Sequence, residues 1–292
     1  MSVDAPEHAQ SAEDAEAPRG DAKAAVALQR LGRGLVWTGA LLGRAAARAG
    51  RSIAGAYQAI DPDVRRHAAQ LPLIGLTQLG ARQGAPAAMP DDGHRPVIFI
   101  HGLQGARGNF MGMQAFFRLA GRRRTYAVSL RPGAPMRELA EDLSRFLEGV
   151  IACNGLPEGK RVDLVAHSMG GLVARLALTS PATAARVGTL VTLGTPHAGT
   201  HAARFAATAQ TLELRPGSVI LAALEEQLPW GSLPGQPRLV ALWSRSDMLL
   251  LPPESGRLEG AENIEVEGFT HFAYLLHPEG WAKALAALER EA

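Results

Sequence analysis

The stretch RVDLVAHSMGGLVARLAL, residues 161–178, indicates the fold of the chain. Its first half is rich in apolar residues, with Val162, Leu164, Val165 and Ala166, which is typical of a strand buried on both faces of a sheet. Its second half has the apolar spacing of a helix, and Ser168 stands at the junction between the two. Because Ala166 and Gly170 beside it are small, the chain can turn tightly here and lift the serine hydroxyl above the sheet, next to helix amides.

The pattern around Ser168 is AxSxG, one residue away from the GxSxG of a nucleophile elbow. Five residues alone are weak evidence, because a serine before a helix is also an ordinary N-cap. The apolar strand before Ser168 and the helix after it favour the nucleophile. We therefore predict Ser168 as the catalytic serine.

Short β-rich runs alternate with helical stretches from Arg95 onward. The predicted strands cover 96–100, 125–130, 161–166, 187–193, 238–243 and 263–268, and the clearest helices cover 136–151, 172–178 and 277–291. Alternation of apolar strands with helices predicts the α/β class, with a mainly parallel sheet covered by helices on both faces.

A general base and its acid are expected after the nucleophile, in the order Ser, Asp or Glu, His. Asp247 and His271 each follow a predicted strand. Loops at the carboxyl edge of a parallel sheet converge, so both side chains can reach Ser168. Glu254 is the alternative acid. His277 is the alternative base, although its position is that of a residue that starts the last helix.

Two backbone amides are candidates for an oxyanion hole. One belongs to Leu103, in the loop after the strand PVIFI, and the other to Met169, directly after Ser168. His101 precedes the same loop. Because it comes before the nucleophile in the chain, we expect it to shape the loop and not to act as the base.

Five blocks of sequence resemble the α/β-hydrolase superfamily, in its bacterial lipase and esterase branch. They are HGLQG at 101–105, AHSMGG at 166–171, LVTLGTPHAGT at 190–200, SRSD at 244–247 and FTHF at 269–272. The resemblance covers 95–292 and implies the α/β-hydrolase fold, an oxyanion hole from the first block, and a triad of Ser168, His271 and Asp247. TLGTPHAG is the most specific block, and its His197 is expected to be structural and to line the floor of the site, with a substrate contact as the alternative.

Residues 201–237 lie between the TPHAGT block and the next strand, where the minimal fold needs only one helix. The segment contains VILAALEEQL at 219–228, followed by PWGSLPGQP. An amphipathic helix beside Gly and Pro turns predicts a helical lid that offers apolar surface to an acyl chain. An ordinary helix covering the sheet has the same pattern and is the alternative.

The chain before residue 95 falls outside this pattern. Residues 1–18 hold five acidic side chains and no Lys or Arg, and we predict a disordered tail. Residues 19–94 are predicted to form a basic helical extension and a linker. The basic amphipathic pattern over 19–55 predicts either docking on the hydrolase domain, 95–292, or peripheral contact with an anionic membrane.

Composition limits the class of protein. Apolar residues make up 47% of the chain and charged residues 20%, which excludes wholesale disorder and a multispan membrane protein. A net charge of +2 implies no strong attraction to nucleic acid, and we expect no such partner. The single cysteine, Cys153, excludes an internal disulfide and a thiolate zinc site. We expect no cofactor and no metal, with calcium left open.

The acidic start is the reverse of a secretory signal, so the expected location is the cytoplasm, with peripheral contact at the inner membrane as an alternative. The expected function is a serine carboxylic-ester hydrolase of lipase or esterase type, acting on an acyl ester or lipid through an acyl-enzyme. A thioesterase, a polyester depolymerase or an acyltransferase would use the same triad. A non-catalytic membrane-surface protein with this fold is the remaining alternative, and it predicts a broken triad.

Overall fold

The computed structural model of the chain describes residues 60–78, 84–227, 230, 231 and 235–290. The chain divides into two compact units, Met1–Ile60 and Asp61–Ala292, and nearly all described residues belong to the second. The predicted tail 1–18 and the basic segment 19–55 lie outside the described residues. The second unit begins at Asp61 and not at the predicted boundary of 95, because a helix at 62–77 packs on the sheet-containing body.

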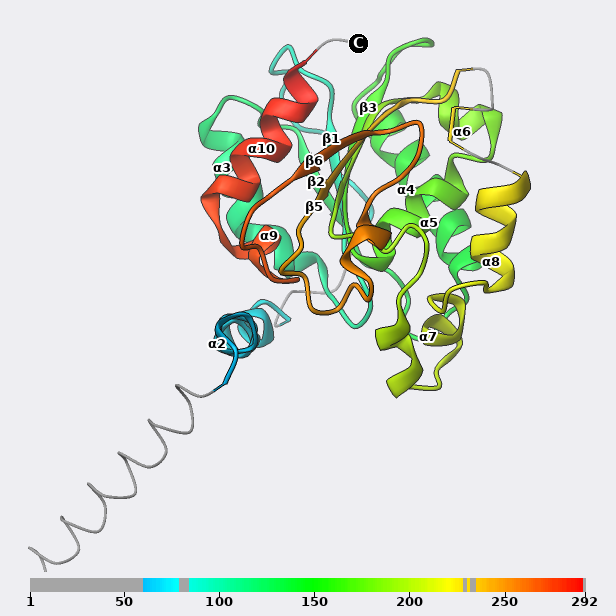
Figure 1. Cartoon of the computed structure of the whole chain (residues 1–292). Helices are drawn as coiled ribbons and strands as arrows, with labels where there is room; N and C mark the ends of the chain where they lie inside the picture. The colour runs from blue at the N-terminus through cyan, green and yellow to red at the C-terminus, as the bar shows by residue number, and fades with distance from the viewer. Residues whose placement is uncertain (1–59, 79–83, 228–229, 232–234, 291–292) are drawn as a thin grey trace, which may run out of the picture. The chain divides into compact units, whose positions relative to one another are not determined.

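A six-stranded sheet forms the centre of the second unit, with the strand order β2-β1-β3-β4-β5-β6 (Figure 1). The strands are β1 (Val97–Ile100), β2 (Thr125–Val128), β3 (Val162–His167), β4 (Val187–Leu193), β5 (Arg238–Trp243) and β6 (Glu262–Glu265). Every neighbouring pair is parallel. All six predicted strands are confirmed, with boundaries shifted by up to three residues at the weakest one, β6.

Helices cover both faces of the sheet, as predicted (Figure 1). Their bounds are α2 (Pro62–Thr77), α3 (Met111–Leu119), α4 (Met136–Cys153), α5 (Met169–Ala177), α6 (Pro181–Ala185), α7 (Ala209–Glu213), α8 (Val219–Ala222), α9 (Ala273–Leu276) and α10 (Pro278–Glu289). Short helical turns are η1 (Arg107–Phe110), η2 (His201–Phe205), η3 (Ala223–Gln227) and η4 (Pro253–Gly256). Among the described residues, no helix combines the length and the apolar character needed to cross a bilayer.

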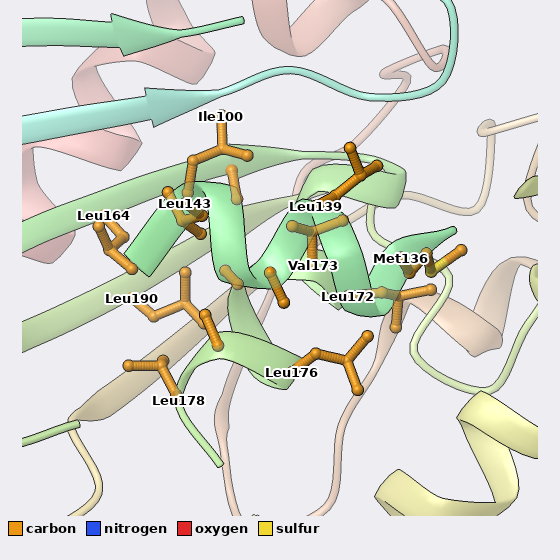
Figure 2. Close-up of a cluster of buried hydrophobic side chains, with 14 of the residues drawn as sticks. Ile100, Met136, Leu139, Leu143, Leu164, Leu172, Val173, Leu176, Leu178 and Leu190 are labelled. Carbon is orange, nitrogen blue, oxygen red and sulfur yellow. The ribbon is translucent and has the colours of Figure 1, made fainter. Parts of the chain in front are cut away.

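Two apolar layers hold the helices to the sheet, one on each face. Alternate strand residues point to opposite faces, so Ile98 and Ile100 join the layer with α4 and α5, whereas Val97 and Phe99 join the layer with α3, α9 and α10. Figure 2 shows the first layer, where Leu139 and Leu143 of α4 lie near leucines from α5, β3 and β4. Both faces are covered, so every residue of the central strands β1, β3 and β4 is buried.

The strand order places a switch in chain direction between β1 and β3. The chain runs from β1 outward to β2 and then returns to the other side of β1 as β3. The loops that leave the carboxyl ends of β1 and β3 therefore diverge and leave a crevice between them. Leu103 and Ser168 follow these two strand ends, so the switch point is where the predicted site should form.

A buried ion pair lies at the amino end of the central strand β3, opposite the strand ends that carry the predicted site. Asp163, at the start of β3, is 1% exposed and lies 2.7 Å from the Arg122 guanidinium. It also accepts a hydrogen bond from the Thr189 amide at 3.1 Å. Burial raises the pKa of Asp163, and the charge of Arg122 opposes this shift. The carboxylate therefore depends on its partner to stay charged in the interior.

Removal of Arg122 should test this dependence. We expect Arg122→Met to lower the free energy of unfolding at pH 7 by about 3 kcal/mol, because it removes the buried cation of Asp163 and leaves only the half-exposed Arg95, at 3.4 Å. Arg131→Met is the matched control, since Arg131 is exposed and pairs with carboxylates only at the surface. Urea denaturation measures both. Equal stability of the two variants would contradict the proposed role of the pair.

Candidate active site

Ser168 stands at a sharp turn between β3 and α5. Its backbone has φ 54° and ψ −130°, a conformation that residues other than glycine rarely adopt. The amide of Ser168 donates to the Leu193 carbonyl at 2.9 Å, and its carbonyl accepts from Thr195 Oγ1 at 2.9 Å. These contacts hold the strained turn in place. Thr195 belongs to the TLGTPHAG block, and we had not predicted this role for it.

Glycines beside the turn allow backbone segments to approach closely. A Cβ at Gly170 would lie 2.6 Å from the His101 carbonyl oxygen and 2.7 Å from that of Ile100. A Cβ at Gly102 would lie 2.7 Å from Ser168 Cβ. Real Cβ atoms do not make such contacts, so the sequence must have glycine at both positions. Ala166, which departs from GxSxG, is fully buried in β3.

The structure brings Ser168, His271 and Asp247 together in one hydrogen-bonded row. Ser168 Oγ lies 2.9 Å from His271 Nε2. On the other side of the ring, His271 Nδ1 lies 3.0 and 2.9 Å from the two Asp247 oxygens. Asp247 is fully buried and also accepts the Leu249 amide at 3.1 Å. This order leaves Nδ1 as the donor to the carboxylate and Nε2 free to accept the serine proton.

The two alternative residues lie elsewhere. Glu254 is exposed and faces Arg245 at 3.9 Å, so it is not the partner of His271. His277 is the N-cap of α10 and its ring lies 5.9 Å from that of Phe269. This agrees with its predicted position at the start of the last helix.

His167 fixes the backbone of the His271 loop, and the sequence analysis had not assigned it a role. His167 Nε2 donates to the His271 carbonyl oxygen at 2.8 Å, and the two rings lie 4.7 Å apart. Burial holds the pKa of His167 well below its ordinary value, and the nearby His271 and His101 act in the same direction. The neutral ring carries its proton on Nε2, where the carbonyl accepts it.

The loop after β1 carries the Leu103 amide that was predicted for the oxyanion hole. His101 orders this loop, since its Nε2 accepts the Leu130 amide at 2.9 Å and its Nδ1 contacts the Gly102 carbonyl at 2.9 Å. Burial lowers the pKa of His101. Among the described residues, no acceptor takes up the amides of Leu103 or Met169. Both amides therefore remain available to an oxyanion beside Ser168.

His197 is buried below the site and does not line the cavity. Arg175 donates to its Nδ1 at 3.4 Å, and its Nε2 lies 3.1 Å from Thr192 Oγ1. Burial and the charge of Arg175 hold the pKa of His197 well below its usual range. Burial also lowers the pKa of Arg175 to about 10. His197 thus links α5 to the strand β4 in a neutral, hydrogen-bonded form.

A cavity of about 520 Å³ opens above Ser168 and His271. Leu71 and Ile74 of α2 form part of one wall, and Phe205, Leu214 and Leu250 contribute to the others. The volume lies in the range of small-molecule sites, and the apolar walls suit an acyl chain. Within the described parts of the chain, no three His, Cys, Asp or Glu side chains converge as metal ligands would.

The predicted lid, 201–237, has two parts with different surroundings. Residues between 200 and 214, including η2 and α7, line the cavity. Farther along, Ile220, Leu221 and Leu224 are buried in the apolar layer of α4 and α5. The first part therefore lies at the cavity, and the second has the position expected of a helix covering the sheet.

Comparison with known proteins agrees with the fold. The fold is similar to that of lipase B from Aspergillus fumigatus, with a TM-score of 0.60 over 71% of this chain and 55% of that one, at 18% identity. Residues 137–213 match the family described as PGAP1-like alpha/beta domain. A triacylglycerol lipase from Burkholderia plantarii is 30% identical over 151 residues, 47% of this chain and 40% of that protein. The fold is that of the α/β-hydrolases, and the matched segments are similar to lipase-like and esterase-like proteins.

Another relative is the GPI inositol-deacylase of Cryptococcus neoformans var. neoformans serotype D. It is 46% identical over 66 residues, which cover 21% of this chain and 8% of that protein. The chain thus spans less than half the length of the curated relatives it matches. The family match over 137–213 contains the turn at Ser168 and the block that supplies Thr195.

The buried histidine at 197 makes stability depend on pH. Its pKa is lower in the folded protein than the 6.5 of an unfolded chain, so below pH 6.5 the unfolded chain binds the proton more readily. The contribution of neutral His197 to the free energy of unfolding is therefore complete above pH 6.5 and is lost as the pH falls below it. We expect His197→Gln to reduce the decline in unfolding free energy between pH 7 and pH 5 by up to about 1.4 kcal/mol per pH unit. Urea titrations at several pH values measure it, and an unchanged slope would contradict a neutral His197.

Proposed function

We propose that the protein hydrolyses carboxylic esters of acyl chains, with Ser168 as the nucleophile of an acyl-enzyme mechanism. The observation that carries this proposal is the row of hydrogen bonds from Asp247 through His271 to Ser168, at the floor of an apolar cavity. Each contact is within 3.0 Å, so proton transfer needs no rearrangement of the side chains.

Acylation follows from this order. As Ser168 Oγ attacks the ester carbonyl carbon, His271 Nε2 takes the hydroxyl proton. The carbonyl oxygen becomes an oxyanion, which accepts hydrogen bonds from the amides of Leu103 and Met169. When the tetrahedral intermediate collapses, the bond to the alcohol breaks and His271 returns the proton to the departing oxygen. The acyl group is then bound to Ser168.

Deacylation repeats the sequence with water as the attacking group. His271 takes a proton from water, the hydroxide adds to the acyl carbon, and the oxyanion is bound by the same amides. Collapse releases the fatty or other carboxylic acid and returns the proton to Ser168 Oγ. Asp247 stabilises the His271 cation in both halves, and its complete burial strengthens this attraction.

The apolar walls and the relatives support an acyl chain as the group that is bound. Leu71, Ile74 and Leu214 offer the cavity hydrocarbon surface, and one relative is named a triacylglycerol lipase and another a deacylase. Phe205 lines the cavity and is 91% exposed, which supports contact of the mouth with a lipid surface. The basic composition of the segment 19–55 supports the same contact, on anionic lipid.

The serine can be tested by covalent labelling. We expect a fluorophosphonate probe to label the unchanged protein and Ser180→Ala, but not Ser168→Ala. Ser180 is the matched control because it caps α6 away from the row. We also expect Asp247→Asn to lower kcat on a soluble ester by about 10⁴-fold, because His271 loses its orienting acceptor. Labelling of Ser168→Ala, or turnover without loss in Asp247→Asn, would remove the proposed mechanism.

The same enzyme should respond to the physical state of its substrate. If the apolar mouth contacts lipid, the rate should rise when an ester is raised above its solubility limit and forms an emulsion. Phe205→Ser should reduce this rise, whereas Leu119→Ser should not, since Leu119 is 89% exposed on α3 and lies outside the cavity lining. Initial rates across the solubility limit measure the effect. A flat profile for the unchanged protein would exclude the interfacial contact.

A further inference from the structure

Helix α2 precedes every motif of the hydrolase pattern, and yet it contacts both loops that flank Ser168. One is the loop at 269–272, which carries His271, and the other is the loop at 102–109, which carries the Leu103 amide. Residues of α2 also line the cavity between these loops. Nothing in the predicted mechanism uses this helix.

The contact with the His271 loop is polar and buried. Thr270 Oγ1 donates to Gln70 Oε1 at 2.8 Å, and both side chains are nearly inaccessible, at 1% and 8% exposure. One turn earlier, the ring of His67 stacks on that of Phe272 at 5.0 Å. Residues on both sides of His271 are therefore fixed to α2. Burial lowers the pKa of His67, and the proximity of His271 lowers it further while Asp247 opposes this.

The contact with the Leu103 loop lies at the other end of the helix. Asn109 Nδ2 donates to Thr77 Oγ1 at 2.5 Å, and Asn109 Oδ1 accepts the Ala106 amide at 2.7 Å. The backbone approaches as closely as the side chains do, because a Cβ at Gly108 would lie 2.1 Å from the Thr77 carbonyl oxygen. Thr77 thus fixes Asn109, and Asn109 fixes the turn that follows Leu103.

Apolar packing does not account for the position of α2. Gln70 and Ile74 are its only buried residues. Val64, Leu71 and Leu73 are 38%, 49% and 52% exposed, so the helix has no continuous apolar stripe against the body. The buried or half-buried polar contacts with the two loops are consequently a large share of what holds it there.

We propose that Gln70 and Thr77 are positioning residues for the reaction, in which Gln70 holds the loop of the general base and Thr77 holds the loop of the oxyanion donor. Because one helix carries both residues, it links the loop of the base to the loop of the oxyanion donor across Ser168. This inference rests on the proposed ester hydrolysis and names two residues that hold the loops of its reacting groups. Small displacements of either loop lengthen the hydrogen bonds on which transition-state stabilisation depends.

The test removes each hydrogen bond with a side chain of similar size. We expect Gln70→Leu and Thr77→Val each to lower kcat on a soluble ester by between about 10-fold and 100-fold, with KM within about twofold. The rate of fluorophosphonate labelling of Ser168 should fall in parallel. Leu73→Gln, on the exposed side of the same helix, is the matched control and should keep both rates. Rates are expressed per labelled active site, so that unfolded protein does not contribute.

A double variant separates positioning from general stability. In Gln70→Leu with Thr270→Val, both polar partners are replaced and no buried group lacks a hydrogen bond. If the hydrogen bond orients the loop, we expect the double variant to regain the thermal midpoint that Gln70→Leu alone loses, while its kcat stays low. Recovery of kcat together with the midpoint would overturn the positioning role and reduce Gln70 to a structural residue.

The outcomes also distinguish this inference from the function on which it rests. If the unchanged protein hydrolyses the ester and both single variants match its kcat, the positioning role is overturned and the proposed function stands. If the unchanged protein neither labels at Ser168 nor turns over any ester, the proposed function fails, and the positioning role fails with it.

Discussion

The contact between Ser168 Oγ and His271 Nε2 depends on the backbone conformation at residue 168. A positive φ at a residue other than glycine costs free energy, and the surroundings must hold it there. They do so with a hydrogen bond from the Ser168 amide to the Leu193 carbonyl, with one from Thr195 to the Ser168 carbonyl, and with glycines that let β1 approach the start of α5. The strain is the reason why the hydroxyl projects above the sheet, within 2.9 Å of the ring.

Three buried histidines of the described residues stay neutral, unlike His271, which is proposed to change its charge. His101, His167 and His197 each have a pKa lowered chiefly by burial, and each hydrogen-bonds to backbone or to a fixed side chain. A neutral His167 also avoids a second cation beside His271, 4.7 Å away. In the proposed mechanism, proton transfer is therefore confined to the ring of His271, whose partner Asp247 is withdrawn from water.

Local pattern sufficed to predict the strands, the longer helices α4, α5 and α10, and the three residues of the row, because strand periodicity and turn residues are read within a few positions. Contacts between distant segments could not be predicted this way. Gln70 and Thr270 are 200 residues apart, and α2 has no apolar stripe to suggest what it packs on. The role of His167 was equally hidden, since its partner is a backbone carbonyl 104 residues later. The sequence placed the start of the domain at 95 and not at 61, because the contacts that join α2 to the rest of the unit are between distant segments.

Trapping the acyl group tests the central claim most directly. The protein would be mixed with a chromogenic ester, quenched in acid before the steady state, digested and examined by mass spectrometry. The account predicts one added acyl mass on the peptide that contains Ser168, formed at the rate of the alcohol burst and lost as product acid accumulates. Ester turnover with an unmodified Ser168 peptide, or with the acyl group on another residue, would contradict it.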